Sequence, residues 1–97
     1  MATELQKYYD KRDELLKEWK KYPDYFGRVK KIGKSKVTLI GGKKRGAVIL
    51  IYSHLSSKDD YLNLTEEVHF MEWENAVDEY NNLKNSKDIM DLLRRNM

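Results

Sequence analysis

The chain has 97 residues, of which 40% are hydrophobic and 36% are charged, and its formal net charge is +3. This length is typical of one domain with one modest hydrophobic core, so we expect a single domain over residues 1–97. The lack of cysteine excludes disulfide bonds and a thiol nucleophile, and the lack of a long apolar run or a signal-type N-terminus predicts an intracellular protein without a membrane partner.

The first predicted element is a helix over residues 3–22, with Thr3 as its N-cap and Pro23 directly after its end. Its apolar positions recur at intervals of three and four residues, which is the spacing of one helical face. The face is rich in Tyr and Trp, and we expect it to pack on the protein core. The alternative is that this face binds a partner. The candidate interface residues are Tyr8, Arg12 and Trp19.

Three strands are predicted next, over residues 26–32, 37–40 and 47–52, with glycine-containing turns at 33–36 and 41–46. The short turns favour an antiparallel meander, in which each strand pairs with the next one along the chain. The third strand, AVILIY, is apolar at every position. We therefore expect it to be central, with both of its faces covered.

The following segment fits two patterns. Apolar residues alternate with period two from Leu62 to Phe70, which indicates a fourth strand, and they recur with helical spacing from Phe70 to Leu83. We favour the helical interpretation, with Thr65 and then Ser86 as N-caps of two successive helices. The predicted elements are an extended piece at residues 61–64, a helix over 66–84 and a last helix over 87–95.

Together these elements predict a single-domain α+β fold. Its centre is an antiparallel sheet of three or four strands arranged as a meander. A long N-terminal helix and two C-terminal helices pack on this sheet, and we expect them to lie largely on one of its faces.

The sequence offers no convincing catalytic arrangement, so we expect neither an enzyme nor a cofactor. Ser53 and His54 are neighbours on a predicted strand, and neighbouring side chains of a strand point to opposite faces. Glu66, His69 and Glu72 have a helical spacing of three, which could hold a metal only with ligands from elsewhere. A solvated acidic surface is the simpler interpretation of these three residues.

The charged residues are segregated along the chain. Residues 25–58 contain nine Lys or Arg and no Asp or Glu, whereas residues 59–97 contain ten Asp or Glu and four Lys or Arg. Nine cations on a short segment repel one another unless an anion lies nearby. That anion is either the acidic C-terminal third, from the same or a second copy, or an external polyanion.

The predicted function is non-catalytic binding through this basic meander, with nucleic acid as the leading partner. Lys outnumbers Arg seven to two in residues 25–58, and Lys makes no forked hydrogen bonds to base edges, so we expect sequence-nonspecific contacts with phosphates. Tyr25, Phe26 and Tyr52 could add base stacking, although core positions are the simpler expectation. The candidate nucleic-acid-binding residues are Arg28, Lys30, Lys31, Lys34, Lys36, Lys43, Lys44 and Arg45.

The alternative function is a protein-interaction or inhibitor module that forms a homodimer. It would use either the aromatic N-terminal helix or the acidic C-terminal helix. A homodimer held by charge dissociates as salt rises, whereas one held by apolar contacts does not.

Two segments, YYDKRDELLKEWKKYPDYFGRV and KNSKDIMDLLRRNM, together with the length and the cysteine-poor composition, carry a resemblance. The chain resembles the small proteins of filamentous and rod-shaped viruses that infect hyperthermophilic archaea. This resemblance implies a viral protein in the cytoplasm of the host cell, an α+β fold, high thermal stability and a role in the infected cell. It transfers no functional residue to this chain.

Overall fold

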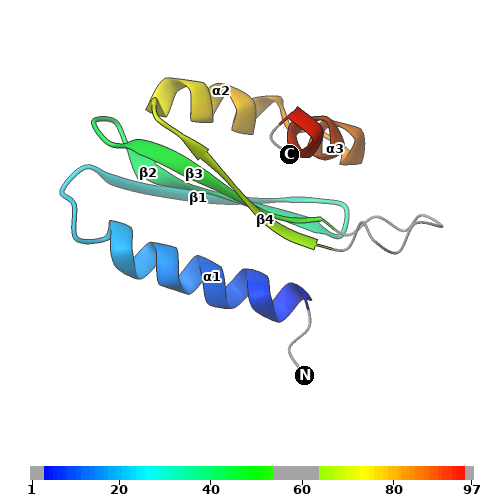
Figure 1. Ribbon diagram of the computed structural model, residues 1–97, viewed down its shortest axis with the longest axis horizontal. Coiled ribbons are helices and arrows are strands. Elements are labelled where there is room, and N and C mark those ends of the chain that lie inside the picture. The colour runs from blue at the N-terminus through cyan, green and yellow to red at the C-terminus, as the bar shows by residue number, and fades with distance from the viewer. Residues whose placement is uncertain (1–3, 54–63, 96–97) are drawn as a thin grey trace.

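The computed structural model describes residues 4–53 and 64–95. Four strands form one sheet in the order β1-β2-β3-β4, and every pair of neighbours is antiparallel. The predicted α+β fold with an antiparallel meander, flanked by one N-terminal and two C-terminal helices, is therefore confirmed (Figure 1). The elements are α1 (Glu4–Trp19), β1 (Tyr25–Ile32), β2 (Ser35–Gly42), β3 (Gly46–Ser53), β4 (Leu64–Phe70), α2 (Trp73–Asn82) and α3 (Ser86–Arg95).

The sheet is the middle of three layers, with α1 on one face and α2 and α3 on the other (Figure 1). Alternate residues of β3 enter two separate cores: Ile49 and Ile51 pack beneath α2 and α3, whereas Val48 and Leu50 pack beneath α1. The expectation that the helices lie largely on one face is therefore wrong. The physical reason is that β3 is apolar on both faces, so each face of the sheet needs its own helical cover. The expectation that this strand is central and covered on both sides is confirmed.

The N-terminal helix is shorter than predicted at its C-terminal end. α1 ends at Trp19, and two turn hydrogen bonds follow, from the Tyr22 N–H to the Trp19 carbonyl (3.1 Å) and from the Tyr25 N–H to the Tyr22 carbonyl (3.2 Å). Pro23 disfavours a helical backbone at the residue before it, so the chain turns here and enters β1. The predicted N-cap, Thr3, lies outside the described residues.

The predicted helix over residues 66–84 is wrong in its first part, because Leu64–Phe70 forms β4. Val68 is buried in the core, as the period-two pattern requires. Thr65 is therefore no N-cap: its hydroxyl donates to the backbone carbonyl of Glu4 at 3.0 Å and connects β4 to the start of α1. The helical spacing applies only after Phe70, and α2 begins at Trp73.

The last helix begins one residue earlier than predicted, and its cap is shifted. The side-chain oxygen of Asn85 accepts the Asp88 N–H at 3.0 Å, and the Asp88 carboxylate accepts the Lys84 N–H at 2.9 Å. The first bond satisfies a backbone donor that the first turn of α3 leaves without an intrahelical partner, and the second holds the preceding residue against this turn. Asn85, rather than Ser86, therefore caps α3, and the buried Ile89 anchors the helix to the sheet.

Candidate functional site

The eight predicted basic residues do not form one surface. Lys34 lies in the β1–β2 turn, whereas Lys43, Lys44 and Arg45 form the β2–β3 turn at the opposite end of the sheet (Figure 1). The eight residues of β2 separate these turns, a length of roughly 26 Å at the usual rise of a strand. A meander places successive turns at alternate ends of the sheet, so the basic residues of the two turns are not adjacent.

The basic residues of β1 and β2 are also divided between the two faces. Arg28 and Lys30 lie on the face that α2 and α3 cover, and Lys31 and Lys36 lie on the α1 face. Lys31 and Lys36 are direct cross-strand partners. Like charges in this position destabilise a sheet. The Lys36 ammonium lies 6.0 Å from the centroid of the Tyr9 ring of α1.

Lys30 and Arg45 each connect separate parts of the fold. The Lys30 ammonium donates to the backbone carbonyl of Tyr80 and lies 4.3 Å from the centroid of its ring. Burial lowers the pKa of Lys30. The Arg45 guanidinium forms an ion pair of 2.6 Å with Asp24 and lies 4.1 Å from the Tyr22 ring centroid. Lys30 thus joins β1 to α2, and Arg45 joins the β2–β3 turn to the segment before β1.

An aromatic groove of about 490 Å³ opens between β1 and α2. The Phe26 and Trp73 rings meet edge to face, with their centroids 5.1 Å apart, and both are half-buried. The Arg28 guanidinium lies 5.0 Å from the Phe26 centroid, and the exposed Lys43 lines the groove from the β2–β3 turn. We call this site the β1–α2 groove; it combines an apolar aromatic wall with two cations.

One carboxylate, that of Asp24, also lines the β1–α2 groove, and its charge is compensated. Partial loss of water disfavours its ionised form, but the Lys44 N–H at 3.3 Å and the Arg45 guanidinium outweigh this effect. The pKa of Asp24 is consequently held below its usual value. Arg28 and Lys43 remain as the charges that an anionic ligand would meet.

Sequence reasoning found part of this groove. Arg28 and Lys43 are among the predicted basic residues and Phe26 is a predicted stacking candidate, whereas the sequence pattern predicts Trp73 only as part of a helix. Of the three aromatic residues considered for stacking, Tyr25 and Tyr52 pack against the core on the α1 face. The sequence offers no signal for Trp73, because the predicted helix over residues 66–84 places it in the middle of a helix, whereas in the structure it begins α2.

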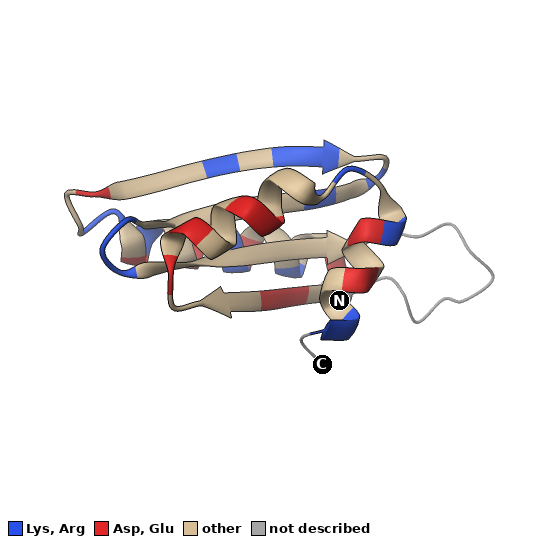
Figure 2. Ribbon diagram, turned by 90° about the horizontal axis from the view of Figure 1, so that it is seen from above, with Lys and Arg blue, Asp and Glu red and all other residues tan. Residues whose placement is uncertain are grey.

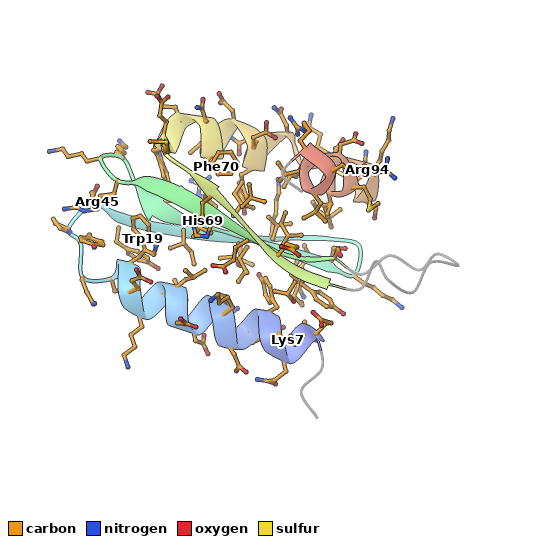
Figure 3. All side chains as sticks on the ribbon, in the orientation of Figure 1. Lys7, Trp19, Arg45, His69, Phe70 and Arg94 are labelled. Atoms are coloured by element: carbon orange, nitrogen blue, oxygen red, sulfur yellow. The ribbon has the colours of Figure 1, made fainter. Side chains whose placement is uncertain are left out.

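The candidate interface on α1 is largely occupied by the sheet. Tyr8 is 0% exposed and its hydroxyl forms a hydrogen bond with that of Thr38, so its assignment to an interface is wrong. Trp19 is half-buried between α1 and the sheet (Figure 3). Arg12 is also half-buried, and its Nε atom has no hydrogen-bond partner within the described part of the chain. For these last two residues the interface stays a prediction.

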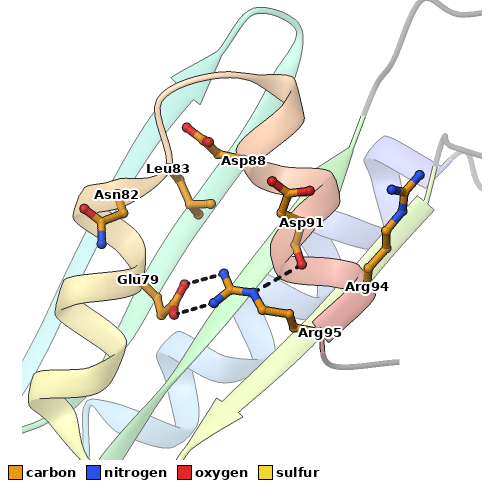
Figure 4. A pocket seen from close by; sticks show the side chains of 7 residues that line it. All are labelled: Glu79, Asn82, Leu83, Asp88, Asp91, Arg94 and Arg95. Atoms are coloured by element: carbon orange, nitrogen blue, oxygen red, sulfur yellow. Dashed lines mark hydrogen bonds and ion pairs between the residues drawn. The ribbon is translucent and has the colours of Figure 1, made fainter.

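A second hollow of about 490 Å³ lies between α2 and α3 (Figure 4). Arg95 donates to both carboxylate oxygens of Glu79, at 3.1 and 2.9 Å, and to the backbone carbonyl of Asp91 at 3.3 Å. A two-point arginine–carboxylate contact of this kind fixes the relative position of two elements. The hollow is therefore explained as the junction at which α2 and α3 are held together.

Glu66, His69 and Glu72 do not share a helical face in the structure. Glu66 and His69 belong to β4, where an odd separation puts their side chains on opposite faces. No group of three or more potential metal ligands occurs within residues 4–53 and 64–95. Of the neighbouring pair considered for nucleophilic chemistry, Ser53 is buried and His54 lies outside the described residues.

None of the described helices is long and apolar enough to cross a membrane. Comparison of the chain with family models, with curated proteins and with solved structures finds no match. The function is therefore inferred from the residues and geometry of this chain.

Proposed function

We propose that the chain is a non-catalytic, intracellular protein that binds single-stranded nucleic acid in the β1–α2 groove. One base would pack against Phe26 and Trp73, and the adjoining phosphates would lie against Arg28 and Lys43. The observation that supports this proposal is the aromatic wall beside two cations, in a groove of about 490 Å³. Every base has a face that can stack on an aromatic ring, so such binding tolerates many sequences.

A single strand suits the groove better than a duplex does. The bases of a duplex are paired and stacked, so an aromatic wall can reach them only where strands are separated. A duplex would also need a continuous row of cations for its backbone, whereas Lys34 and Lys43 lie at opposite ends of the sheet. We therefore expect weak binding to duplex DNA and stronger binding to an unpaired strand.

Trp73 provides a direct readout, since the chain has only two tryptophans. In a Trp19→Phe background, we expect a short oligothymidine to quench the emission of Trp73. If two phosphates are neutralised, affinity should fall about sevenfold between about 50 and about 200 mM salt. Unchanged emission over the whole titration would refute the proposal.

Two substitutions test the groove itself. Lys43→Glu changes an exposed turn residue, so it should weaken binding at least about tenfold, by turning attraction into repulsion, without affecting the fold. Trp73→Leu removes the stacking surface and should weaken binding by about 5- to 150-fold. Lys87→Glu is the matched control, because Lys87 is exposed on α3 and does not line the groove. Equal losses for Lys43→Glu and Lys87→Glu would mean that the groove is not the site.

The resemblance to proteins of viruses from hyperthermophilic hosts leads us to propose a high melting temperature as well. Two ion pairs, Lys11 with Glu67 at 3.5 Å and Arg95 with Glu79 at 2.9 Å, connect separate elements of the fold. Such pairs are more favourable at high temperature, because the cost of removing water from charges falls. We expect thermal unfolding, followed by circular dichroism, well above about 60 °C. A melting temperature below that value would contradict a hyperthermophilic origin.

A further inference from the structure

The two edges of the sheet carry opposite charges. Within the described residues, β1 and β4 each pair with one strand only. β1 contains Arg28, Lys30 and Lys31 and no acid, whereas β4 contains Glu66 and Glu67 and no Lys or Arg. Figure 2 shows the basic segments of β1 along one margin of the sheet and the acidic segment of β4 along the opposite margin. The molecule is therefore electrically complementary to a second copy of itself.

The β1 edge also exposes apolar surface. Val29, in the middle of this strand, is 59% exposed. An edge strand presents unpaired backbone N–H and C=O groups, and lysines on it discourage pairing. The positive charges of β1 therefore discourage pairing with a basic or neutral strand, but they attract an acidic strand.

We propose that β4 of a second copy adds to β1 and continues the antiparallel sheet from one molecule to the next. Charge selects this pairing among the three that the edges permit. Two β1 strands would place Lys and Arg side chains against each other, and two β4 strands would do the same with Glu side chains. Like charges in cross-strand positions are destabilising, so only the pairing of β1 with β4 is favourable.

The geometry of the meander allows this addition. Because strand directions alternate, β4 of a second copy in the same orientation runs antiparallel to β1. A register that sets Lys30 opposite Glu66 of the second copy also sets Phe26 opposite Phe70 of the second copy. In both chains these side chains lie on the α2 face, so the helices of successive copies remain on matching sides.

Arg12 gives independent support. Its guanidinium lines a hollow of about 200 Å³ on the α1 face, together with Gly27 and Val29. Its buried Nε atom has no hydrogen-bond partner within the described residues. In the register above, Glu67 of the second copy lies opposite Val29 on this same face. The added strand would bring a carboxylate to the side of β1 where Arg12 lies.

The pairing does not close on itself. Each copy uses its basic edge for one neighbour and its acidic edge for another, and a head-to-tail contact of this kind produces open chains of molecules. We therefore expect the average mass in low salt to rise continuously with protein concentration and to fall as salt screens the edges. A fixed mass of two chains would contradict this arrangement.

Two edge variants test the proposal. On the α1 face, Val29→Glu with Lys31→Glu makes β1 acidic, and Glu67→Lys with His69→Lys makes β4 basic. In the register above, position 67 of one copy lies opposite position 29 of the other and diagonal to position 31. In sedimentation velocity, each variant alone should remain monomeric at concentrations where the unsubstituted chain associates. An equimolar mixture should associate again, because each acidic edge then finds a basic one. A mere loss of stability cannot produce this rescue.

The matched control is Lys17→Glu with Glu18→Lys, which alters exposed charges of α1 away from both edges, and association should be unchanged. The Lys31→Glu substitution should not weaken the fold, because it replaces the opposed pair of Lys31 and Lys36 by an attractive one. If the unsubstituted chain stays monomeric up to millimolar concentration, or if the mixture does not associate, the edge charges serve only to prevent aggregation and the proposal is wrong.

This assembly is independent of the proposed nucleic-acid binding. The substituted positions 31, 67 and 69 do not line the β1–α2 groove, and position 29 lies on the opposite face of the sheet. The edge variants should therefore still quench Trp73 emission with oligothymidine. If the chain associates but does not bind oligothymidine, the proposed nucleic-acid binding has failed. If it binds oligothymidine but does not associate, the proposed assembly has failed.

Discussion

Replacement of Tyr8 by alanine is expected to lower the free energy of unfolding by about 3–5 kcal/mol, the range for a large buried aromatic side chain. Tyr8 is completely buried in the core between α1 and the sheet, and its ring contacts those of Tyr9 and Tyr52 at centroid distances of 5.5 and 6.2 Å. A domain of this size has a total stability of about 5–15 kcal/mol. The loss is therefore a large share of the total, and urea unfolding followed by circular dichroism measures it.

Tyr9→Ala is the control, because Tyr9 is the same residue type on the same helix but is only half-buried. It should cost clearly less than Tyr8→Ala. Equal costs for the two substitutions would contradict the orientation of α1 on the sheet.

The hydroxyl of Tyr8 can be tested separately from its ring. Tyr8→Phe removes one partner of the buried hydrogen bond with Thr38 and should cost about 1–3 kcal/mol, because the Thr38 hydroxyl then lacks that partner. Burial raises the pKa of Tyr8, so the neutral phenol makes this bond at all ordinary pH values. The double substitution Tyr8→Phe with Thr38→Val should recover part of the loss, since no buried hydroxyl of the pair remains.

The second large effect is expected at Gly46, the first residue of β3. Its φ of +85° is a backbone conformation that L side chains rarely adopt, and an added Cβ would collide with the backbone carbonyl of Phe70 and lie 2.9 Å from that of Met71. Gly46→Ala should therefore lower the free energy of unfolding by roughly 3 kcal/mol or more, since the strained φ alone costs about 1–2 kcal/mol. Denaturant unfolding of the purified variant measures this loss.

Gly33 provides the matched control for this substitution. It also has a positive φ, +61°, but apart from its chain neighbours no heavy atom of residues 4–53 and 64–95 lies within 4 Å of an added Cβ. Gly33→Ala should cost only about 1–2 kcal/mol, the strain of the backbone conformation. If both substitutions cost the same, the chain between β4 and α2 does not pass close to Gly46.

The sequence already contained the information that was missed at β4. A strand that is apolar at every position, such as β3, needs a neighbour on each side and a cover on each face. β2 supplies one neighbour, so a further strand had to follow β3. The helical spacing after Phe70 correctly indicates α2, but it does not apply to Glu66 and Glu67, which follow the alternating pattern of β4.

The β1–α2 groove was less accessible to sequence reasoning. Phe26 and Trp73 belong to elements far apart in the chain, and each one alone fits the pattern of a core residue. Their contact depends on how α2 crosses the sheet, which periodicity does not specify. The spread of the lysines was, by contrast, predictable, because a meander places Lys34 and Lys43 at opposite ends of the sheet.

The meander also determines how directly the chain can reach its native state. Every strand pairs with its neighbour in sequence, so each hairpin closes at a small entropic cost. The contacts of α1 with β4, through Thr65 to Glu4 and Lys11 to Glu67, instead join residues 61 and 56 positions apart in the chain. Local pairing of this kind is associated with rapid folding, whereas docking of α1 depends on contacts of long sequence separation.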